Sequence, residues 1–316
     1  MDEFTNGIVS IVIVTCGKWE YLASCLDSIK KQSYRNLEII VVNNIHSEKI
    51  EVDLPVRFPG VHLLSNFKQP FYCQALNLGI SHASGEFILC LNDDVILDDQ
   101  FVNEARKGFS ISEKIGMVSG KILRKDAQTL DSTGLFLSLS RTARERGYGK
   151  EDSARYNKEG SIFGVNGAVA FYRKKMLEEI KEGSYFDPVY RIFFEDLDIA
   201  WRAQRHGWKG YYMPKAIAYH VRGGTSRNAE GIDKPFARKY MSDEFNLYLL
   251  RNWYLTIIKN ESCVGLLLHV PFIAAYELMA WTYIITCRPR LIKEFVRNTH
   301  HLRNALLARF QWSPSA

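Results

Sequence analysis

The chain has 316 residues, of which 47% are hydrophobic and 24% are charged, and its formal net charge is +6. This composition is that of a globular protein with a large core, and it excludes the disordered and fibrous classes. The excess positive charge lies at the C-terminus, where residues 288–316 contain six arginines or lysines and one glutamate. Because these charges are terminal and lack interleaved stacking aromatics, the sequence predicts no nucleic-acid partner.

The six cysteines show no CxxC or zinc-like spacing, and several fall inside apolar runs: Cys16, Cys25, Cys73, Cys90, Cys263 and Cys287. We expect them to be reduced core residues of a cytosolic protein. The N-terminal segment MDEFTNGIVS is acidic and lacks the basic flank and apolar core of a signal peptide. Both features predict a cytoplasmic chain.

The first part of the chain alternates between predicted strands and helices. Apolar, β-branched runs predict strands at residues 8–15, 37–42, 61–65 and 87–91, with a helix at 19–32, a loop between the second and third strands, and a helix at 72–83. A helix at 99–110 and a strand at 115–120 continue the pattern. This alternation predicts an α/β fold with a doubly wound, mostly parallel sheet.

Residues 124–160 are rich in charge and glycine and have little periodicity, so we interpret them as a surface excursion at the border of the active site. Regular structure resumes with a strand at 162–172, where Gly164 and Gly167 would permit close approach of backbone or substrate. Helices at 174–182 and 194–206, strands at 208–213 and 216–220, and a flexible loop at 222–226 follow.

The chain is predicted to be helical after residue 235, beginning with a helix at 239–259. The next segment, 263–287, is largely apolar but contains Glu277 near its middle. Burying that carboxylate in a bilayer is costly, so we expect a buried hairpin or a helix in one leaflet rather than a span. The basic segment after it, with Leu291, Phe295 and Leu302 between arginines, predicts a helix on an anionic membrane surface. The alternative is a solvated helix packed on the domain.

Three groups of polar residues lie at chain positions compatible with one cleft: Asn92-Asp93-Asp94 after a strand, Glu195-Asp196 with Asp198 at a helix start, and His220 with the Gly-Gly-Thr-Ser sequence after it. Each has a structural alternative: a solvated turn, a charge complement to the helix dipole, or a satisfied polar side chain. Together they can hold one divalent ion and supply one general base, since acids that follow parallel strands lie at the ligand-binding edge of the sheet.

The segments SIVIVT, EIIVVNN, ALNLGI, SGEFILCLNDD, FFEDLDIAWRAQRHGWKGYYMP and AYHVRGGTS, in this order, resemble the inverting family 2 glycosyltransferases. The resemblance covers about residues 8–260 and implies the GT-A fold, a Rossmann-like, mostly parallel sheet flanked by helices, with a C-terminal helical extension. The acidic motifs and the His-x-x-Gly-Gly-Thr-Ser loop are most similar to bacterial dTDP-rhamnosyltransferases of O-antigen and cell-surface polysaccharide synthesis.

The implied function is metal-dependent transfer of L-rhamnose from dTDP-rhamnose to a lipid-linked or saccharide acceptor. Two alternatives stay open: a UDP-galactofuranose, UDP-galactose or UDP-N-acetylglucosamine transferase of the same fold, and a non-catalytic nucleotide-sugar-binding module. By resemblance, Asp94 and His220 would hold Mg²⁺ or Mn²⁺. Asp196 would be the base that deprotonates the acceptor hydroxyl, and Glu195 would shape the site.

The resemblance also implies a nucleotide and donor pocket, formed by Thr15, Cys16, Asn43, Asn77, Asn92, Asp93 and Arg202. Asn43 stands where the family usually has Asp, and it keeps a carbonyl acceptor for a pyrimidine N3–H. Cys16-Gly17 stands where the family usually has Tyr-Asn.

The resemblance divides the chain into a GT-A domain at 1–235 and a membrane-associating helical region at 236–316. Within the domain, 8–123 would be the nucleotide-binding half, 124–160 a variable surface loop and 161–235 the acceptor and catalytic half. We expect a peripheral protein on the inner face of the cell membrane, acting on a lipid-linked saccharide, and the sequence leaves room for a homo-oligomer.

Overall fold

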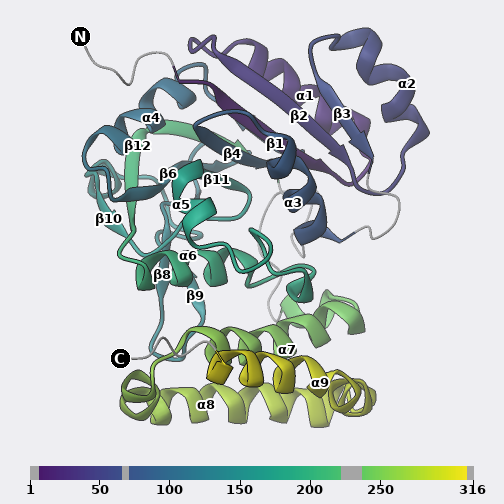
Figure 1. Ribbon diagram of the computed structural model, residues 1–316, viewed down its shortest axis with the longest axis vertical. Helices are drawn as coiled ribbons and strands as arrows, with labels where there is room; N and C mark the ends of the chain where they lie inside the picture. The colour runs from purple at the N-terminus through teal and green to yellow at the C-terminus, as the bar shows by residue number, and fades with distance from the viewer. Residues whose placement is uncertain (1–6, 66–70, 222–236, 312–316) are drawn as a thin grey trace.

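A ten-stranded mixed sheet forms the centre of the part of the chain that the computed structural model describes, residues 7–65, 71–221 and 237–311 (Figure 1). Its main path runs in the order β10-β12-β6-β11-β4-β1-β2-β3, with β5 paired to β12 and β7 paired to β6. The strands are β1 (Val9–Thr15), β2 (Leu37–Asn43), β3 (His62–Ser65), β4 (Phe87–Asn92), β5 (Val95–Leu97), β6 (Ile115–Arg124), β7 (Leu130–Ser132), β10 (Gly160–Ile162), β11 (Val169–Arg173) and β12 (Lys209–His220), with β8 (Leu135–Leu137) and β9 (Ala143–Glu145) in a separate hairpin.

Helices cover both faces of the sheet. They are α1 (Trp19–Lys30), α2 (Glu48–Arg57), α3 (Tyr72–His82), α4 (Phe101–Ser110), α5 (Lys174–Glu179), α6 (Glu195–Arg205), α7 (Asp243–Asn260), α8 (Cys263–Cys287) and α9 (Arg290–Gln311). Parallel pairing of β3, β2, β1 and β4 places the carboxyl ends of these strands at one edge. β11 then runs antiparallel between β4 and β6, so the predicted mixed, mostly parallel sheet is confirmed.

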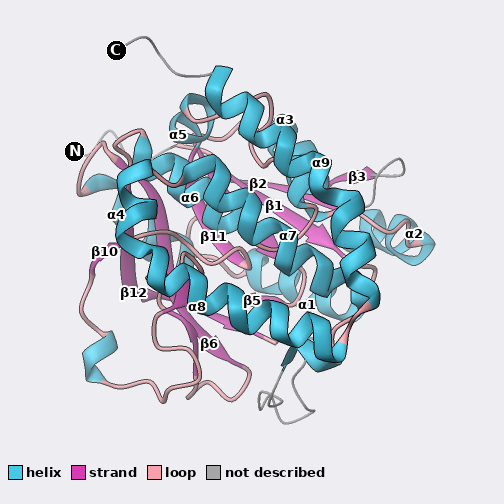
Figure 2. Ribbon diagram, turned by 90° about the horizontal axis from the view of Figure 1, so that it is seen from below, coloured by secondary structure: helices cyan, strands magenta, loops and turns pink. Residues whose placement is uncertain are grey.

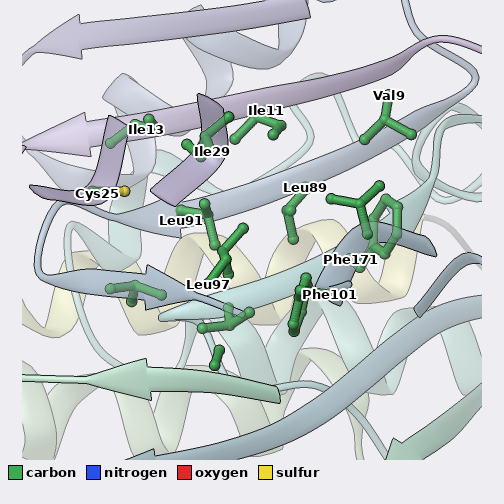
Figure 3. Close-up of a cluster of buried hydrophobic side chains, with 14 of the residues drawn as sticks. Val9, Ile11, Ile13, Cys25, Ile29, Leu89, Leu91, Leu97, Phe101 and Phe171 are labelled. Carbon is green, nitrogen blue, oxygen red and sulfur yellow. The ribbon is translucent and has the colours of Figure 1, made fainter. Parts of the chain in front are cut away.

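The apolar runs form strands because their side chains are buried on both faces. In β1, Val9, Ile11 and Ile13 pack under α1, α2 and α4, whereas Val12 and Val14 pack under α3, α5 and α6. Figure 3 shows the first of these two layers, where the β1 side chains meet residues of β4 and α1. A strand without a polar face must lie inside a sheet that helices cover on both sides.

Outside residues 124–160, the predicted strands and helices are present, with four differences. α2 lies where a loop was predicted. The sequence gives no periodic signal for this helix, because only Ile50 and Leu54 of it are buried and Pro55 stands near its end. The short strand β5 after the acidic turn was not predicted. The predicted strand at 162–172 is two strands, β10 and β11. The two strands predicted at 208–220 are one, β12, with an irregularity between Met213 and Ile217.

Residues 124–160 are not a simple surface excursion. β7 pairs with β6, and Leu130, Asp131, Ser132 and Thr133 are fully buried. The hairpin β8–β9 then extends from the sheet toward the C-terminal helices (Figure 1). The segment therefore joins the sheet to the C-terminal region.

The C-terminal helices form a layer against the α6 side of the domain, with α8 on the outside (Figures 1 and 2). α8 is the one described helix long and apolar enough to cross a membrane, and few of its residues are buried. The predicted buried hairpin is therefore wrong for α8. Conversely, Leu291, Phe295 and Leu302 of α9, predicted to face a membrane, pack inward on the protein. The exposed apolar surface of this region thus lies mainly on α8, and α9 adds Ile292, Val296, Leu306 and Leu307 to it.

Three cysteines, Cys25, Cys73 and Cys90, are buried as predicted, whereas Cys16, Cys263 and Cys287 are exposed, so the core prediction is wrong for these three. All six are free thiols. The predicted loop at 222–226 lies outside the described residues.

Candidate active site

The acidic turn Asn92-Asp93-Asp94 lies where the parallel strands end. β1 and β4 are in register, with Val14 opposite Asn92, so the end of β1 lies beside the turn. Asp93 accepts hydrogen bonds from the Thr15 hydroxyl at 2.7 Å and from the Cys16 backbone N–H at 3.0 Å. Burial raises the pKa of Asp93, although these two hydrogen bonds oppose the shift. Asp93 therefore joins the two strand ends and fixes the turn.

The second acid of the turn, Asp94, faces His220 of β12. Its Oδ1 lies 3.3 Å from Nε2 of His220, and Nδ1 of the same ring lies 2.8 Å from Oδ2 of Asp131. β5 makes this possible, because it pairs with the end of β12 and places Val95 opposite His220. Burial lowers the pKa of His220, but the carboxylates of Asp131 and Asp94 outweigh burial, and the net shift is upward.

The geometry at Asp94 and His220 fits a bound cation. When Nδ1–H donates to Asp131, the lone pair of Nε2 points at the Asp94 carboxylate, and two acceptors face each other. Either a second proton on the imidazole or a positive ion must lie between them. A buried carboxylate that orients a metal-binding histidine in this way is a common arrangement in metal sites.

The described residues contain no cluster of three or more His, Cys, Asp and Glu side chains suited to holding a metal ion. Asp94 and His220 would therefore supply two ligands. Mg²⁺ bound to nucleotides commonly takes one or two protein carboxylates and completes its shell with phosphate oxygens and water. The donor set thus fits a metal that arrives with a diphosphate.

The second acidic pair, Glu195 and Asp196, begins α6. The backbone before it is unusual, since Arg191, Phe193 and Phe194 all have positive φ, at 62°, 70° and 68°. Such conformations cost free energy for residues other than glycine and must be held by their surroundings. The holder here is Asn252 of α7, whose Nδ2 lies 2.9 Å from each of three carbonyl oxygens, those of residues 190, 192 and 193.

The two acids of this pair differ in environment. Burial and the neighbouring charge of Asp196 raise the pKa of Glu195, and its Oε2 is buried with no hydrogen-bond partner among the described residues. Burial also raises the pKa of Asp196, but backbone N–H groups of Leu197 and Gly167 stabilise its ionised form. Asp196 is thus the carboxylate of the pair that is better prepared to accept a proton.

Tyr72 connects the acidic turn to the acids of α6. Its hydroxyl lies 2.9 Å from Oδ1 of Asn92 and 3.1 Å from the carbonyl oxygen of Gly167. Gly167 in turn donates its N–H to Asp196. The structure therefore brings the end of β4 and the start of α6, about 100 residues apart in sequence, to one edge of the sheet.

The two glycines singled out from the sequence differ. A Cβ on Gly164 would lie 2.4 Å from Cβ of Ala200, so α6 packs against the bare backbone there. A Cβ on Gly167 would lie 3.5 Å from Oε1 of Glu195, which is ordinary contact. The expected close approach of the backbone therefore holds at Gly164. At Gly167 the protein atoms leave ordinary space, and close approach of a substrate stays a prediction there.

Three residues predicted to line the donor pocket use their polar groups within the chain. Asn43 bonds to the backbone of Ser47 through both side-chain atoms. Asn77 does the same with Phe186, at 2.7 and 2.8 Å. Arg202 is buried. It donates to Asp198 and to the carbonyl oxygens of residues 180 and 185. Their roles toward a donor remain predictions.

Several residues of this region gave no signal in the sequence. Asp131 lies inside the charged segment 124–160, Tyr72 lies outside the ALNLGI segment of its helix, and Asn252 lies in the middle of a long helix. Glu51 of α2 lies 3.3 Å from Nδ2 of Asn43 and supplies a carboxylate next to the position where the family usually has Asp. Only pairing between distant segments gives these side chains their neighbours.

The fold places the acidic turn after β4 at the carboxyl ends of parallel strands, where α/β sheets bind their ligands, and the acids that begin α6 lie at the same edge. A model of the family described as "Glycosyltransferase like family 2" matches residues 6–242. The chain belongs to glycosyltransferase family 2, and its mixed sheet with flanking helices is the GT-A fold.

Known relatives are distant. Poly-beta-1,6-N-acetyl-D-glucosamine synthase of Staphylococcus epidermidis is 22% identical over 291 residues, which are 88% of this chain and 63% of the synthase. The chain thus spans less than two thirds of that relative.

Among solved structures, S. aureus TarS 1-349 superposes with a TM-score of 0.60 at 13% identity, covering 94% of this chain and 80% of TarS. The same fragment has been crystallised with UDP-GlcNAc. The mannosyltransferase PcManGT of Pyrobaculum calidifontis, in complex with GDP-Man and Mn²⁺, superposes with a TM-score of 0.54 at 13% identity, covering 98% and 88% of the two chains. At this identity these likenesses establish the fold alone.

Proposed function

We propose that the protein is a metal-dependent, inverting glycosyltransferase that moves a sugar from a nucleoside diphosphate to an acceptor hydroxyl. One observation carries this proposal. The Asp94–His220 pair, suited to a cation, and the acid pair Glu195–Asp196, suited to proton transfer, lie at the same edge of the sheet, linked through Tyr72. A transferase of this kind needs both groups together.

In the proposed reaction, Asp196 takes the proton of the acceptor hydroxyl as its oxygen bonds to the anomeric carbon. The bond from that carbon to the diphosphate oxygen breaks in the same step, so the configuration inverts. A divalent ion held by Asp94 and His220 would offset the negative charge on the leaving diphosphate. Glu195, neutral through burial, adds no second charge beside Asp196, and Asn252 fixes the backbone that aims the base.

For the donor, we favour a UDP-sugar, with UDP-N-acetylglucosamine first. The synthase relative is named for N-acetylglucosamine, and TarS has been crystallised with UDP-GlcNAc. The dTDP-rhamnose and O-antigen prediction draws no support from these relatives, and it remains the second candidate on the acidic motifs alone. UDP-galactofuranose and UDP-galactose remain alternatives of the same chemistry.

We further propose that the enzyme works at the inner face of the cell membrane on a lipid-linked saccharide. The exposed apolar side chains of α8 support this location, since Leu267, Leu268 and Leu278 are each about 70% exposed. The basic residues of α9 lie in the same helical layer and would face anionic lipid.

Binding and turnover test the proposal separately. A thermal-shift panel of UDP, dTDP, GDP and their sugars with Mn²⁺ should show stabilisation by the uridine compounds first. A preference for GDP would contradict the nucleotide assignment.

Turnover is measured with labelled UDP-N-acetylglucosamine and dTDP-rhamnose. Asp196→Asn should lower kcat by roughly 10² to 10⁴-fold, and Asp94→Ala should abolish Mn²⁺-dependent turnover. Asp99→Asn changes an exposed acid that follows the acidic turn and is the matched control. It should leave kcat and the dependence of turnover on Mn²⁺ unchanged. Unchanged turnover in Asp196→Asn would contradict the assignment of Asp196 as the base. Binding of nucleotide sugars without any transfer or hydrolysis by the parent would favour the non-catalytic binding module.

A further inference from the structure

A cavity of about 820 Å³ opens beside Glu195 and Asp196. The donor binding proposed above does not use this cavity. Three separate parts of the chain form its walls: the β8–β9 hairpin, the loop that leads into α6, and the C-terminal helices. Its lining residues include Arg144, Phe193, Asp196, Arg238, Tyr276 and Met279. The volume suits one small polar group with a short apolar segment attached to it.

The hairpin wall is held in place by buried contacts to the C-terminal helices. Arg141, at the hairpin tip, pairs with Glu261, and its Nη2 lies 2.9 Å from Nδ1 of His269 on α8. Trp253 of α7 donates its Nε1–H to the carbonyl oxygen of Ser140 at 3.0 Å. The wall is therefore a fixed part of the structure, and Arg144 is presented from it.

The cavity floor continues into the exposed apolar surface of α8. Met279 lines the cavity and is also 67% exposed, and its neighbour Leu278 is 70% exposed. Tyr276 and Tyr283 lie about one helical turn before and after Met279, on the same side of α8, and they line the interior of the cavity. An apolar chain that lies along α8 can thus enter the cavity without crossing a polar surface.

The cavity lining carries two cations, Arg144 and Arg238, besides the acids Glu195 and Asp196. In the described part of the chain neither arginine is paired with a carboxylate. Arg238 donates to the Tyr276 hydroxyl at 3.0 Å, which aims its guanidinium along the apolar wall. Two guanidinium groups next to an apolar floor match a phosphate ester of a lipid, since guanidinium groups bind phosphate oxygens through paired N–H donors.

We propose that this cavity is the acceptor site and that it binds a phosphorylated or diphosphorylated single-chain lipid. The phosphate lies between Arg144 and Arg238, the first apolar units lie against Tyr276 and Met279, and the sugar hydroxyl on the other side of the phosphate faces Asp196. The assignment rests on the proposed function, because it places the acceptor next to the base of that reaction.

The test uses the full chain and measures binding of farnesyl diphosphate by fluorescence or calorimetry, with excess UDP present to occupy the donor site. Farnesol and inorganic pyrophosphate are the comparison probes, one lacking the anion and the other lacking the chain. Farnesyl diphosphate should bind at least about tenfold more tightly than either, since each probe loses one half of the site.

Arg144→Gln and Arg238→Gln should each weaken binding of farnesyl diphosphate by about tenfold, and the Lys variants should recover part of it. Met279→Glu should weaken the binding of farnesyl diphosphate and of farnesol by the same factor. Two exposed residues outside the cavity are the matched controls: Lys150→Gln, a cation within residues 124–160, and Val56→Glu, an apolar residue of α2. Both variants should bind farnesyl diphosphate as the parent does. Equal binding of the three probes, or of the arginine variants and the parent, overturns the assignment.

The two proposals fail in distinguishable ways. Binding of farnesyl diphosphate needs neither a sugar donor nor a metal, so it tests the cavity without turnover. If the lipid binds as described but no nucleotide sugar is consumed, the transferase proposal fails and the lipid site stands. If Asp196-dependent turnover is present but farnesyl diphosphate binds to the cavity variants as tightly as to the parent, the assignment of the lipid site fails.

Discussion

The buried network around Asp198, two residues after the proposed base, makes a quantitative prediction. Asp198 is 1% exposed, and it accepts hydrogen bonds from Arg202 at 2.9 Å and Asn260 at 2.8 Å, with Nζ of Lys259 at 3.4 Å. Burial alone would raise the pKa of Asp198, but the positive charges of Lys259 and Arg202 prevail and lower it to about 2. The carboxylate is therefore ionised in the folded protein at any ordinary pH.

The lowered pKa of Asp198 indicates how much its ionised carboxylate contributes to the stability of the fold. A folded-state pKa near 2, against 3.8 for the ordinary group, corresponds to roughly 2 kcal/mol of stability at neutral pH. Asp198→Asn also leaves Arg202 and Lys259 buried without their counter-charge, and breaking a buried pair costs about 3–5 kcal/mol. We expect Asp198→Asn to lower the free energy of unfolding by about 3 kcal/mol at pH 7.

The lowered pKa of Asp198 also predicts how its contribution to stability changes with pH. Because the pKa of Asp198 is lowered on folding, its stabilisation is fully present above about pH 4 and is lost as the pH falls through about 2. Urea unfolding of the full chain should show a difference between parent and Asp198→Asn that is constant from pH 7 to 4 and shrinks below it. Asp99→Asn is the matched surface control. A difference under about 1 kcal/mol at pH 7, the range of exposed pairs, or one that does not change with acid, would refute the reasoning.

Three further changes test the site and its support. Gly164→Ala should destabilise by roughly 1–3 kcal/mol in urea unfolding, because its methyl group would overlap α6. Gly160→Ala, with nothing within 4 Å, should be near neutral, and equal effects would contradict this packing account. Asp131→Asn should lower the pKa of His220, followed by NMR titration of its ring, and an unchanged pKa would show that Asp131 does not set it. Asn252→Ala should lower kcat by roughly 10 to 100-fold while leaving the donor KM unchanged, since it loosens the backbone that aims the base. An equal rise in KM would point to a general loss of structure instead.

The sequence alone determined the sheet and the position of its chemistry. Strands β1, β2 and β4 are runs of apolar and β-branched residues, and such runs are buried on both faces wherever the chain places them. The acids that follow β4 stand at its carboxyl end for the same local reason, and Glu195 and Asp196 begin a helix whose periodicity is visible in the sequence. These are statements about neighbours in the chain.

The tertiary structure decided the surroundings of each of these acids. Asp93 is tied to the end of β1, and Asp94 is turned toward His220, although the two residues are adjacent and chemically identical. Their separation depends on the parallel pairing of β4 with β1 and on the pairing of β5 with β12. No local pattern records either pairing, because the partners are dozens of residues away.

The dependence on contacts between distant segments also explains which features the sequence alone does not predict. α2 has too few buried positions to produce a periodic signal, and the burial of Asp131 follows only from the pairing of β7 with β6. Apolar composition predicted that α8 or α9 would meet a membrane, but only packing shows that Leu291, Phe295 and Leu302 of α9 turn inward and that most of α8 is exposed. Local periodicity fixes which elements form, whereas contacts between distant segments decide which faces remain free to act.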